Sequence, residues 1–276
     1  MDFSPLIYFY GALYIGIIGI SFIINALLFK KYKIGKIFLG IGIIFLMPAL
    51  YFGIYLIQQE IDRWKALSPM QKAIGINRYN KVKRLIEEGY NINEYNTYSF
   101  SSTALMYAVE KGNIRIVRLL VENGADVNHK PHDRPSMCPL DRAIWRGDTA
   151  IVNYLLAKGA DVSGDSFYPV EFAIRRYKPN NKEIVEALIK YGADFRSNND
   201  LPLGEAINYY YYDIVRCLLE NGAGGYNKRY FKNEAIRKMD FLTGSGKQRE
   251  RNKMQLNKII ELLDEYIQKE EKEKEE

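Results

Sequence analysis

The sequence predicts an all-α protein, in which a transmembrane helical hairpin precedes a solenoid of about six helix–turn–helix units. The first observation is a pattern of two short amphipathic helices separated by glycine, which recurs with a period near 33 residues over positions 68–268. The second is that residues 6–29 and 37–57 contain no charged side chain. Each of these two runs exceeds the ~20 residues that a helix needs to cross a bilayer core.

The predicted hairpin occupies residues 1–58, and a polar linker follows at 59–67. Four lysines lie in the loop between the two spans, at Lys30, Lys31, Lys33 and Lys36. Because loops rich in lysine stay cytoplasmic, we expect an integral protein of the inner (plasma) membrane with its repeats on the outer side, which is the periplasm in a Gram-negative bacterium. The cytoplasmic orientation stays open, since Arg63 and Lys65 follow the second span closely.

The composition argues against a nucleic-acid-binding protein and against a disulfide-bonded one. The formal net charge is only +6, and the sequence has no basic block, zinc-ligand spacing or recognition-helix pattern, so it does not point to nucleic acid. The two cysteines, Cys138 and Cys217, lie two repeats apart. Since neighbouring repeats stack ~10 Å apart, a disulfide between them would exceed its geometric reach.

The clearest unit is 103–128, which reads TALMYAVEKGNIRIVRLLVENGADVN. Leu105, Ala108 and Val109 share one helical face, and a second apolar face follows from residue 116 to residue 120. A Gly-Asn pair separates the two helices, and Gly-Ala-Asp follows the second, at the place where a left-handed residue ends a helix. Such a pair of helices cannot bury its apolar stripe alone, so it requires neighbours.

The neighbouring units align on the glycine that ends the second helix, at intervals of 35, 35, 33 and 30 residues: Gly89, Gly124, Gly159, Gly192 and Gly222. The first helices read TALMYA, CPLDRA, YPVEFA and LPLGEA, the second NIRIVRLL, TAIVNYLL, KEIVEALI and YDIVRCLL, and the following turns NGADVN, KGADVS, YGADFR and NGAGGY. This pattern resembles the ankyrin repeat. The resemblance implies an ankyrin-repeat solenoid over residues 68–268.

The units depart from the ankyrin pattern at one position of the first helix. The histidine that ties neighbouring ankyrin repeats together by hydrogen bonds is replaced by other residues, namely Met106, Asp141, Glu171 and Gly204. We therefore expect the polar ladder between repeats to be weak and apolar packing to supply more of the cohesion.

Both ends of the solenoid are expected to be degenerate caps. Ser68-Pro69 is typical of a helix start and begins the first, most polar unit. At the other end, residues 243–254 are predicted to be a mobile basic insertion, and the charged tail 269–276 is predicted to be disordered. Between the second and third units, 129–137 should project as a finger.

The sequence predicts no catalytic, cofactor or metal site. Catalysis needs an acid, base or nucleophile within mutual reach, and the repeats offer no such set. Asp126, Asp161 and Asp194 recur at one turn position, where aspartate bonds the local backbone. His129 and His132 have no third ligand, which favours a solvated loop over a metal centre. We therefore expect no enzyme.

The ankyrin resemblance implies that a partner protein binds the concave face, formed by the first helices. The side chains expected there combine aromatic rings with basic groups, as interface hot spots do. They are Tyr107, Lys111, Arg142, Trp145, Arg146, Phe172, Arg175, Arg176 and Tyr209. Their charge suits a partner with an acidic surface. The alternative for Phe172 and the run of tyrosines at 209–212 is core packing between repeats.

With its predicted anchor, the chain resembles bacterial membrane-anchored ankyrin immunity proteins. That resemblance implies a partner that is a secreted toxin or effector, which the repeats would bind and block. The alternative is a membrane-localised scaffold or regulator that recruits a cytoplasmic protein. The spans themselves carry no row of ionisable residues, so a channel or transporter subunit is disfavoured.

Overall fold

The computed structural model of the chain describes residues 47, 51–52, 54–59, 61–62, 64–96, 103–130, 137–163, 168–176, 181–242 and 246–275. The chain divides into two compact units, Met1–Leu67 and Ser68–Glu276, so the boundary falls at the predicted start of the repeats. Over the described ranges, no helix has both the length and the apolar character that crossing a membrane requires. The predicted span 6–29, and most of the span 37–57, lie outside the described residues.

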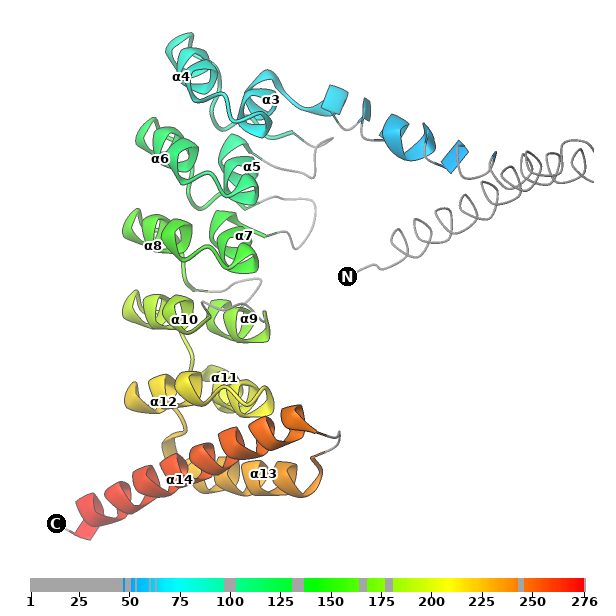
Figure 1. Cartoon of the computed structure of the whole chain (residues 1–276). Helices are drawn as coiled ribbons and strands as arrows, with labels where there is room; N and C mark the ends of the chain where they lie inside the picture. Colours follow the sequence, from blue (N-terminus) through cyan, green and yellow to red (C-terminus); the bar gives the residue numbers. More distant parts are fainter. Residues whose placement is uncertain are drawn as a thin grey trace, which may run out of the picture. The chain divides into compact units, whose positions relative to one another are not determined.

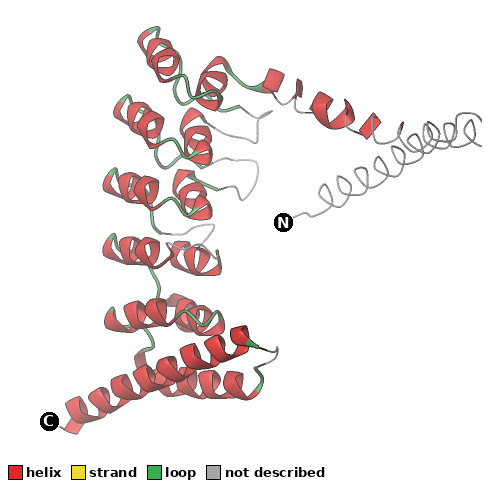
Figure 2. Cartoon of the chain, in the orientation of Figure 1, coloured by secondary structure: helices red, strands yellow, loops and turns green. Residues whose placement is uncertain are grey.

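The second unit is a stack of six helix pairs arranged in two rows (Figure 1). The first helices form one row: α3 (Pro69–Gly75), α5 (Ala104–Lys111), α7 (Pro139–Arg146), α9 (Pro169–Arg175), α11 (Ser197–Asn208) and α13 (Lys228–Asp240). The second helices form the other: α4 (Tyr79–Glu87), α6 (Ile114–Glu122), α8 (Thr149–Ala157), α10 (Asn181–Lys190) and α12 (Tyr212–Glu220). The partner of α13 is the long α14 (Lys247–Glu275), which packs along both α12 and α13. Loops and one short 3₁₀ turn, η1 (Gly225–Asn227), join the helices (Figure 2). The predicted all-α solenoid is confirmed.

Three of the first helices, α3, α5 and α7, begin at side-chain caps. Ser68 and Thr103 accept hydrogen bonds from the backbone N–H groups three residues on, as N-cap residues do. Cys138 serves the same end of α7, where its Sγ accepts from the Asp141 N–H at 3.5 Å and its own N–H donates to the Asp141 carboxylate at 3.0 Å. Proline at the first helical position, as at Pro69, needs no hydrogen-bond partner there.

The glycine after each second helix adopts a left-handed backbone, with φ between 80° and 92° at the five aligned positions. Only glycine takes this conformation without strain, which explains its recurrence in the sequence. The aspartates that follow act as expected: Asp126 Oδ1 accepts from the Asn128 N–H at 2.9 Å, and Asp161 Oδ1 accepts from the Ser163 N–H at 2.8 Å.

The core runs continuously between the two rows. It consists of the aligned apolar positions of every pair, among them the fully buried Leu105, Ile116, Leu140, Ile151 and Ile174. Each helix pair thus covers the apolar stripe of the next, which is how a solenoid forms one core from short units. The stability of the stack depends mainly on this burial.

A polar ladder joins the repeats, contrary to the expectation of a weak one. Asn93 donates to the Gly124 carbonyl at 3.0 Å and accepts from the Asp126 N–H at 2.8 Å. Asn128 repeats both bonds one unit later, to Gly159 at 2.9 Å and Asp161 at 2.8 Å. The ladder lies at the turns after the second helices, and the sequence analysis looked for it at the histidine position of the first helices.

The C-terminal pair corrects two expectations. Residues 247–254, predicted to be a mobile insertion, form the first turns of α14, and the tail predicted to be disordered over 269–276 is helical through Glu275. The helix persists because α14 packs along α13 and α12, burying Leu256, Ile259, Leu262 and Leu263. Near its end, Lys228 and Arg229 of α13 form ion pairs with Glu270 and Glu271.

Most of the predicted finger at 129–137 lies outside the described residues. The two cysteines are free thiols, with Cys217 buried and Cys138 partly so.

Candidate functional site

The predicted binding residues lie on the first helices or directly after them. We call the exposed side of these helices the first-helix face. It comprises the solvent-exposed and half-buried side chains of α5, α7, α9 and α11, in the row opposite the second helices (Figure 1). Each of these helices packs against the next one in the row, so side chains about one repeat apart come into contact along this face. These contacts decide which of the predicted residues a partner could reach.

The centre of the first-helix face is an aromatic and cationic cluster, which we call the Trp145 cluster: Trp145, Phe172 and Arg176. The Trp145 and Phe172 rings stack across two repeats, with centroids 6.1 Å apart and planes inclined by 22°. The Arg176 guanidinium carbon lies 3.0 Å from the centroid of the Trp145 ring, a cation–π contact. Trp145 nevertheless stays 38% exposed, so the cluster offers a preorganised aromatic surface.

Two of the predicted arginines are paired with carboxylates on this face. Arg142 Nη1 lies 3.0 Å from Glu110 Oε2 of the preceding repeat. Arg175 Nη2 lies 2.9 Å from Glu171 Oε1 and 3.0 Å from Glu205 Oε1 of the following repeat. These pairs reduce the positive charge that the sequence analysis assigned to the face. Their glutamates were visible in the sequence, but the pairing depends on the register between repeats.

Arg146 crosses to the preceding repeat, where its Nη1 donates to the Glu110 carbonyl. Its guanidinium also covers Gly112, leaving no room there for a Cβ atom. Lys111 is exposed, with Nζ 5.0 Å from the centroid of the Tyr107 ring. Tyr107 is only 6% exposed. The structure therefore places Tyr107 in the core of the stack, beneath the face that was predicted to display it.

Tyr209 lies at the end of α11, 42% exposed. Its ring stacks on Tyr211, with centroids 5.7 Å apart and planes inclined by 21°. Tyr209 therefore stands apart from the Trp145 cluster, in a group of tyrosines at the turn between α11 and α12.

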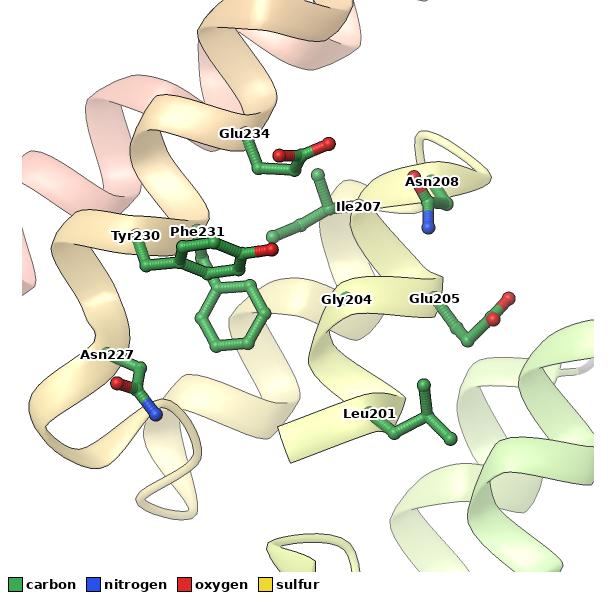
Figure 3. A pocket seen from close by; sticks show the side chains of 9 residues that line it. All are labelled: Leu201, Gly204, Glu205, Ile207, Asn208, Asn227, Tyr230, Phe231 and Glu234. Carbon is green, nitrogen blue, oxygen red and sulfur yellow. The ribbon is translucent and has the colours of Figure 1, made fainter. Parts of the chain in front are cut away.

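A hollow of about 630 Å³ opens between α11 and α13. Figure 3 shows the Tyr230 and Phe231 rings of α13 facing Gly204 and Ile207 of α11. Gly204 occupies the position that the buried Met106 holds three repeats earlier, so the missing side chain leaves the space open. In the sequence, Gly204 is visible only as a departure from the repeat pattern.

The buried thiols are poorly suited to nucleophilic chemistry. Burial and the neighbouring Asp141 charge raise the pKa of Cys138 to about 12, and burial raises the pKa of Cys217 to about 11. Since the thiolate is the reactive form, both thiols are protonated at neutral pH. No group of three His, Cys, Asp or Glu side chains that could hold a metal ion occurs among the residues that the structure describes.

Residues 55–165 match the family model described as ankyrin repeats in three copies. The chain contains ankyrin repeats. Among solved structures, the ankyrin repeat domain of human ASB11 is similar, at 25% sequence identity and a TM-score of 0.53. The similarity covers 72% of this chain and 84% of the ASB11 chain. The comparison with curated proteins gave no match.

The ankyrin repeats make this chain a protein-binding module, since the fold is typically a non-catalytic scaffold for protein interaction. Of the nine residues predicted for the ankyrin face, the structure brings Trp145, Phe172 and Arg176 together. Arg142, Arg146 and Arg175 form contacts between repeats instead, Lys111 and Tyr209 contact other tyrosine rings, and Tyr107 is buried. The contacts between repeats could not be predicted from the sequence, because they join residues about 30 positions apart.

Proposed function

We propose that the chain is a membrane-anchored ankyrin-repeat module that holds a protein partner on the first-helix face, with the Trp145 cluster as the main contact. The observation that carries the proposal is the cluster itself: an exposed tryptophan, fixed by Phe172 and Arg176, at the centre of the row. Interface hot spots are enriched in tryptophan and arginine. A side chain that is already fixed loses little entropy on binding.

The anchor in this proposal is supported by the sequence. The two uncharged runs, 6–29 and 37–57, are long enough to span a bilayer, and the lysines between them favour a cytoplasmic loop. The repeats would then lie outside the inner membrane. Reporter fusions at the C-terminus test this orientation. An active alkaline phosphatase fusion would place the repeats outside the membrane, and a fluorescent green fluorescent protein fusion would place them in the cytoplasm.

In its most specific form, the proposal makes the partner a secreted toxin or effector, which the repeats bind and block. This form is supported by the outward orientation expected from the lysine loop and by the protein-binding nature of the repeats. If the green reporter fluoresces, the partner would instead be a cytoplasmic protein recruited to the membrane, and the immunity role would be abandoned.

The decisive experiment measures binding of the protein encoded by the neighbouring gene to the full-length chain. Replacing Trp145 and Arg146 together by alanine should weaken binding by more than about 2 kcal/mol, or roughly thirtyfold in Kd. Tyr191→Ala is the matched control, since Tyr191 is equally exposed but follows a second helix. Equal affinity in the double variant and the control would remove the first-helix face from the proposal.

A further inference from the structure

A second groove lies at the opposite end of the row from the first repeat, away from the Trp145 cluster. Its volume is about 450 Å³, within the range of ~300–1,000 Å³ that ligand sites occupy. Three segments that are distant in sequence form it: the start of α10, the turn between α11 and α12, and the first turns of α14. The sequence analysis expected the last of these segments to be mobile.

Tyrosines form one wall of this groove, since residues 209–212 are four consecutive tyrosines that all line it. Tyr210 adopts φ of 63°, in the left-handed region that bulky residues avoid. Cations approach two of the rings: Lys238 Nζ lies 5.3 Å from the Tyr210 centroid, and Lys258 Nζ lies 5.8 Å from the Tyr212 centroid. The wall is therefore aromatic and edged with positive charge.

The remaining lining is rich in hydrogen-bond donors. Lys182 and Arg251 contribute cationic groups, and four side-chain amides accompany them, from Asn181, Gln248, Asn252 and Gln255. Among the described residues that line the groove, the one carboxylate belongs to Asp213, whose Oδ1 lies 3.6 Å from Arg216 Nη2. A ligand that presents several acceptors or negative charges would match this lining best.

The charge of the first turns of α14 supports the same conclusion. Four cations, Lys247, Arg249, Arg251 and Lys253, stand against the single carboxylate of Glu250. Positive charge at a helix N-terminus opposes the macrodipole, so these residues do not serve the stability of α14. Within the described residues, none of the four has an ion-pair partner.

We infer that this groove binds an acidic segment of the partner protein. The inference rests on the proposed function and deepens it, because it names the chemistry that the partner presents. On the first-helix face, Glu110, Glu171 and Glu205 already neutralise two of the predicted arginines. The first turns of α14, next to the tyrosine wall, carry four cations without such neutralisation in the described part of the chain.

A short acidic segment fits better than a nucleic acid. Binding a nucleic-acid backbone requires a continuous track of cations for successive phosphates. Here Asp213, Glu186 and Glu220 interrupt the positive surface: Glu186 pairs with Lys182 and Glu220 with Arg216. The groove therefore offers one compact positive site between carboxylates.

The test uses the full-length chain, purified in a neutral detergent, and a hexapeptide of alternating Asp and Glu that carries a zwitterionic fluorophore. We expect saturable binding by fluorescence anisotropy at physiological salt, weakening as salt is added. A second hexapeptide, in which Asn and Gln replace the acids, should bind at least about tenfold more weakly. Equal binding of the two peptides, or no binding of the acidic one, would overturn the inference.

Variants locate the site. Arg251→Gln with Lys182→Gln should weaken binding of the acidic peptide by about tenfold, whereas Lys190→Gln, which removes one exposed cation from the far end of α10, should leave it unchanged. Unchanged binding in the double variant overturns the assignment, as does tighter binding of a single-stranded DNA hexamer than of the acidic peptide. Arg251 and Lys182 lie at exposed or half-buried positions, and melting temperatures check that the fold is kept.

The peptide experiment is independent of the natural partner. If the acidic peptide fails to bind but Trp145→Ala with Arg146→Ala still weakens capture of the partner, the groove is wrong and the proposed function stands. If the peptide binds at the groove and the variant with Trp145→Ala and Arg146→Ala captures the partner normally, the assignment of the first-helix face is wrong instead.

Discussion

The second and third repeats differ from the C-terminal end of the same stack in how they are held together. In α5–α8 the first helices have side-chain caps at Thr103 and Cys138 and end at Gly112 and Gly147, with φ of 71° and 72°. At the C-terminal end, α11 has no side-chain cap, and the turn after it places Tyr210 in the same left-handed region, with φ of 63°.

The forces between neighbours differ in the same way. The asparagine ladder links the early repeats through backbone groups. At the C-terminal end, Asp200 Oδ1 accepts from the Gly224 N–H at 3.0 Å, and three ion pairs join α13 to α14, formed by Lys228, Arg229 and Lys232. The regular repeats are therefore joined by side-chain hydrogen bonds to the backbone of the next repeat. The irregular C-terminal repeats are joined by the packing and ion pairs of one long helix, α14.

The largest effect should come from removing α14. A chain that stops at Gly246 loses the burial of Leu256, Ile259, Leu262 and Leu263, and leaves the apolar sides of α12 and α13 in water. At roughly 1.5–3 kcal/mol for each buried side chain, its free energy of unfolding should fall by more than about 5 kcal/mol. Urea denaturation measures this change.

A shorter truncation provides the control. Removing only 269–276 should cost about 2 kcal/mol, chiefly because the buried Lys228 loses Glu270. If the two truncations are equally destabilising, cohesion at this end comes from the ion pairs and not from apolar packing.

The asparagine ladder should contribute less. Asn128→Ala removes two hydrogen bonds to the next repeat, to the Gly159 carbonyl and from the Asp161 N–H. We expect a loss of about 2 kcal/mol in unfolding free energy. Asn123→Ala, which removes a bond to the Leu119 carbonyl of its own helix, should cost less than about 0.5 kcal/mol. A cost for Asn128→Ala no greater than for this control would show that the ladder adds nothing to stability.

Replacing glycine by alanine should change the stability in opposite directions in the two regions. Gly147 needs its left-handed backbone, so Gly147→Ala should lower the free energy of unfolding by about 1 kcal/mol. Gly204 lies within α11, and an added Cβ would meet only the Phe231 ring, at 3.5 Å. Gly204→Ala should therefore raise stability by about 1 kcal/mol through better helix propensity. Thermal unfolding of both variants tests the signs, and destabilisation by Gly204→Ala would contradict the open space at the hollow.

The smallest effect concerns pH. The hydrogen bond from the Ser163 N–H lowers the pKa of Asp161 below its usual value. A carboxyl whose pKa is lower in the folded state adds stability above its unfolded pKa of about 4, and this stability is lost as the pH falls through the folded pKa. The advantage in melting temperature of the native chain over Asp161→Asn should therefore shrink below about pH 4. If the difference in melting temperature between the two chains stays constant below about pH 4, the Asp161 carboxylate does not contribute to stability in this way.

Much of the repeat fold could be predicted, and less of the site. The period, the glycine turns and the Ser68-Pro69 start were correct because each depends on residues close together in sequence. The prediction of a disordered tail was wrong, because contacts with α13 stabilise the last turns of α14. Tyr107 was placed on the surface although its neighbours in the stack bury it. Glu110 and Glu205 were in view, but their pairing with Arg142 and Arg175 depends on contacts between repeats.

The sequence by itself determined the helix pairs and the protein-binding class of the repeats, because backbone conformation and amphipathic period are properties of a few adjacent residues. Only the tertiary structure decided which side chains face a partner, where positive charge remains uncompensated and how the C-terminal end is closed. The physical reason is that these properties arise from pairs of residues some thirty positions apart, which come together only when one repeat packs on the next.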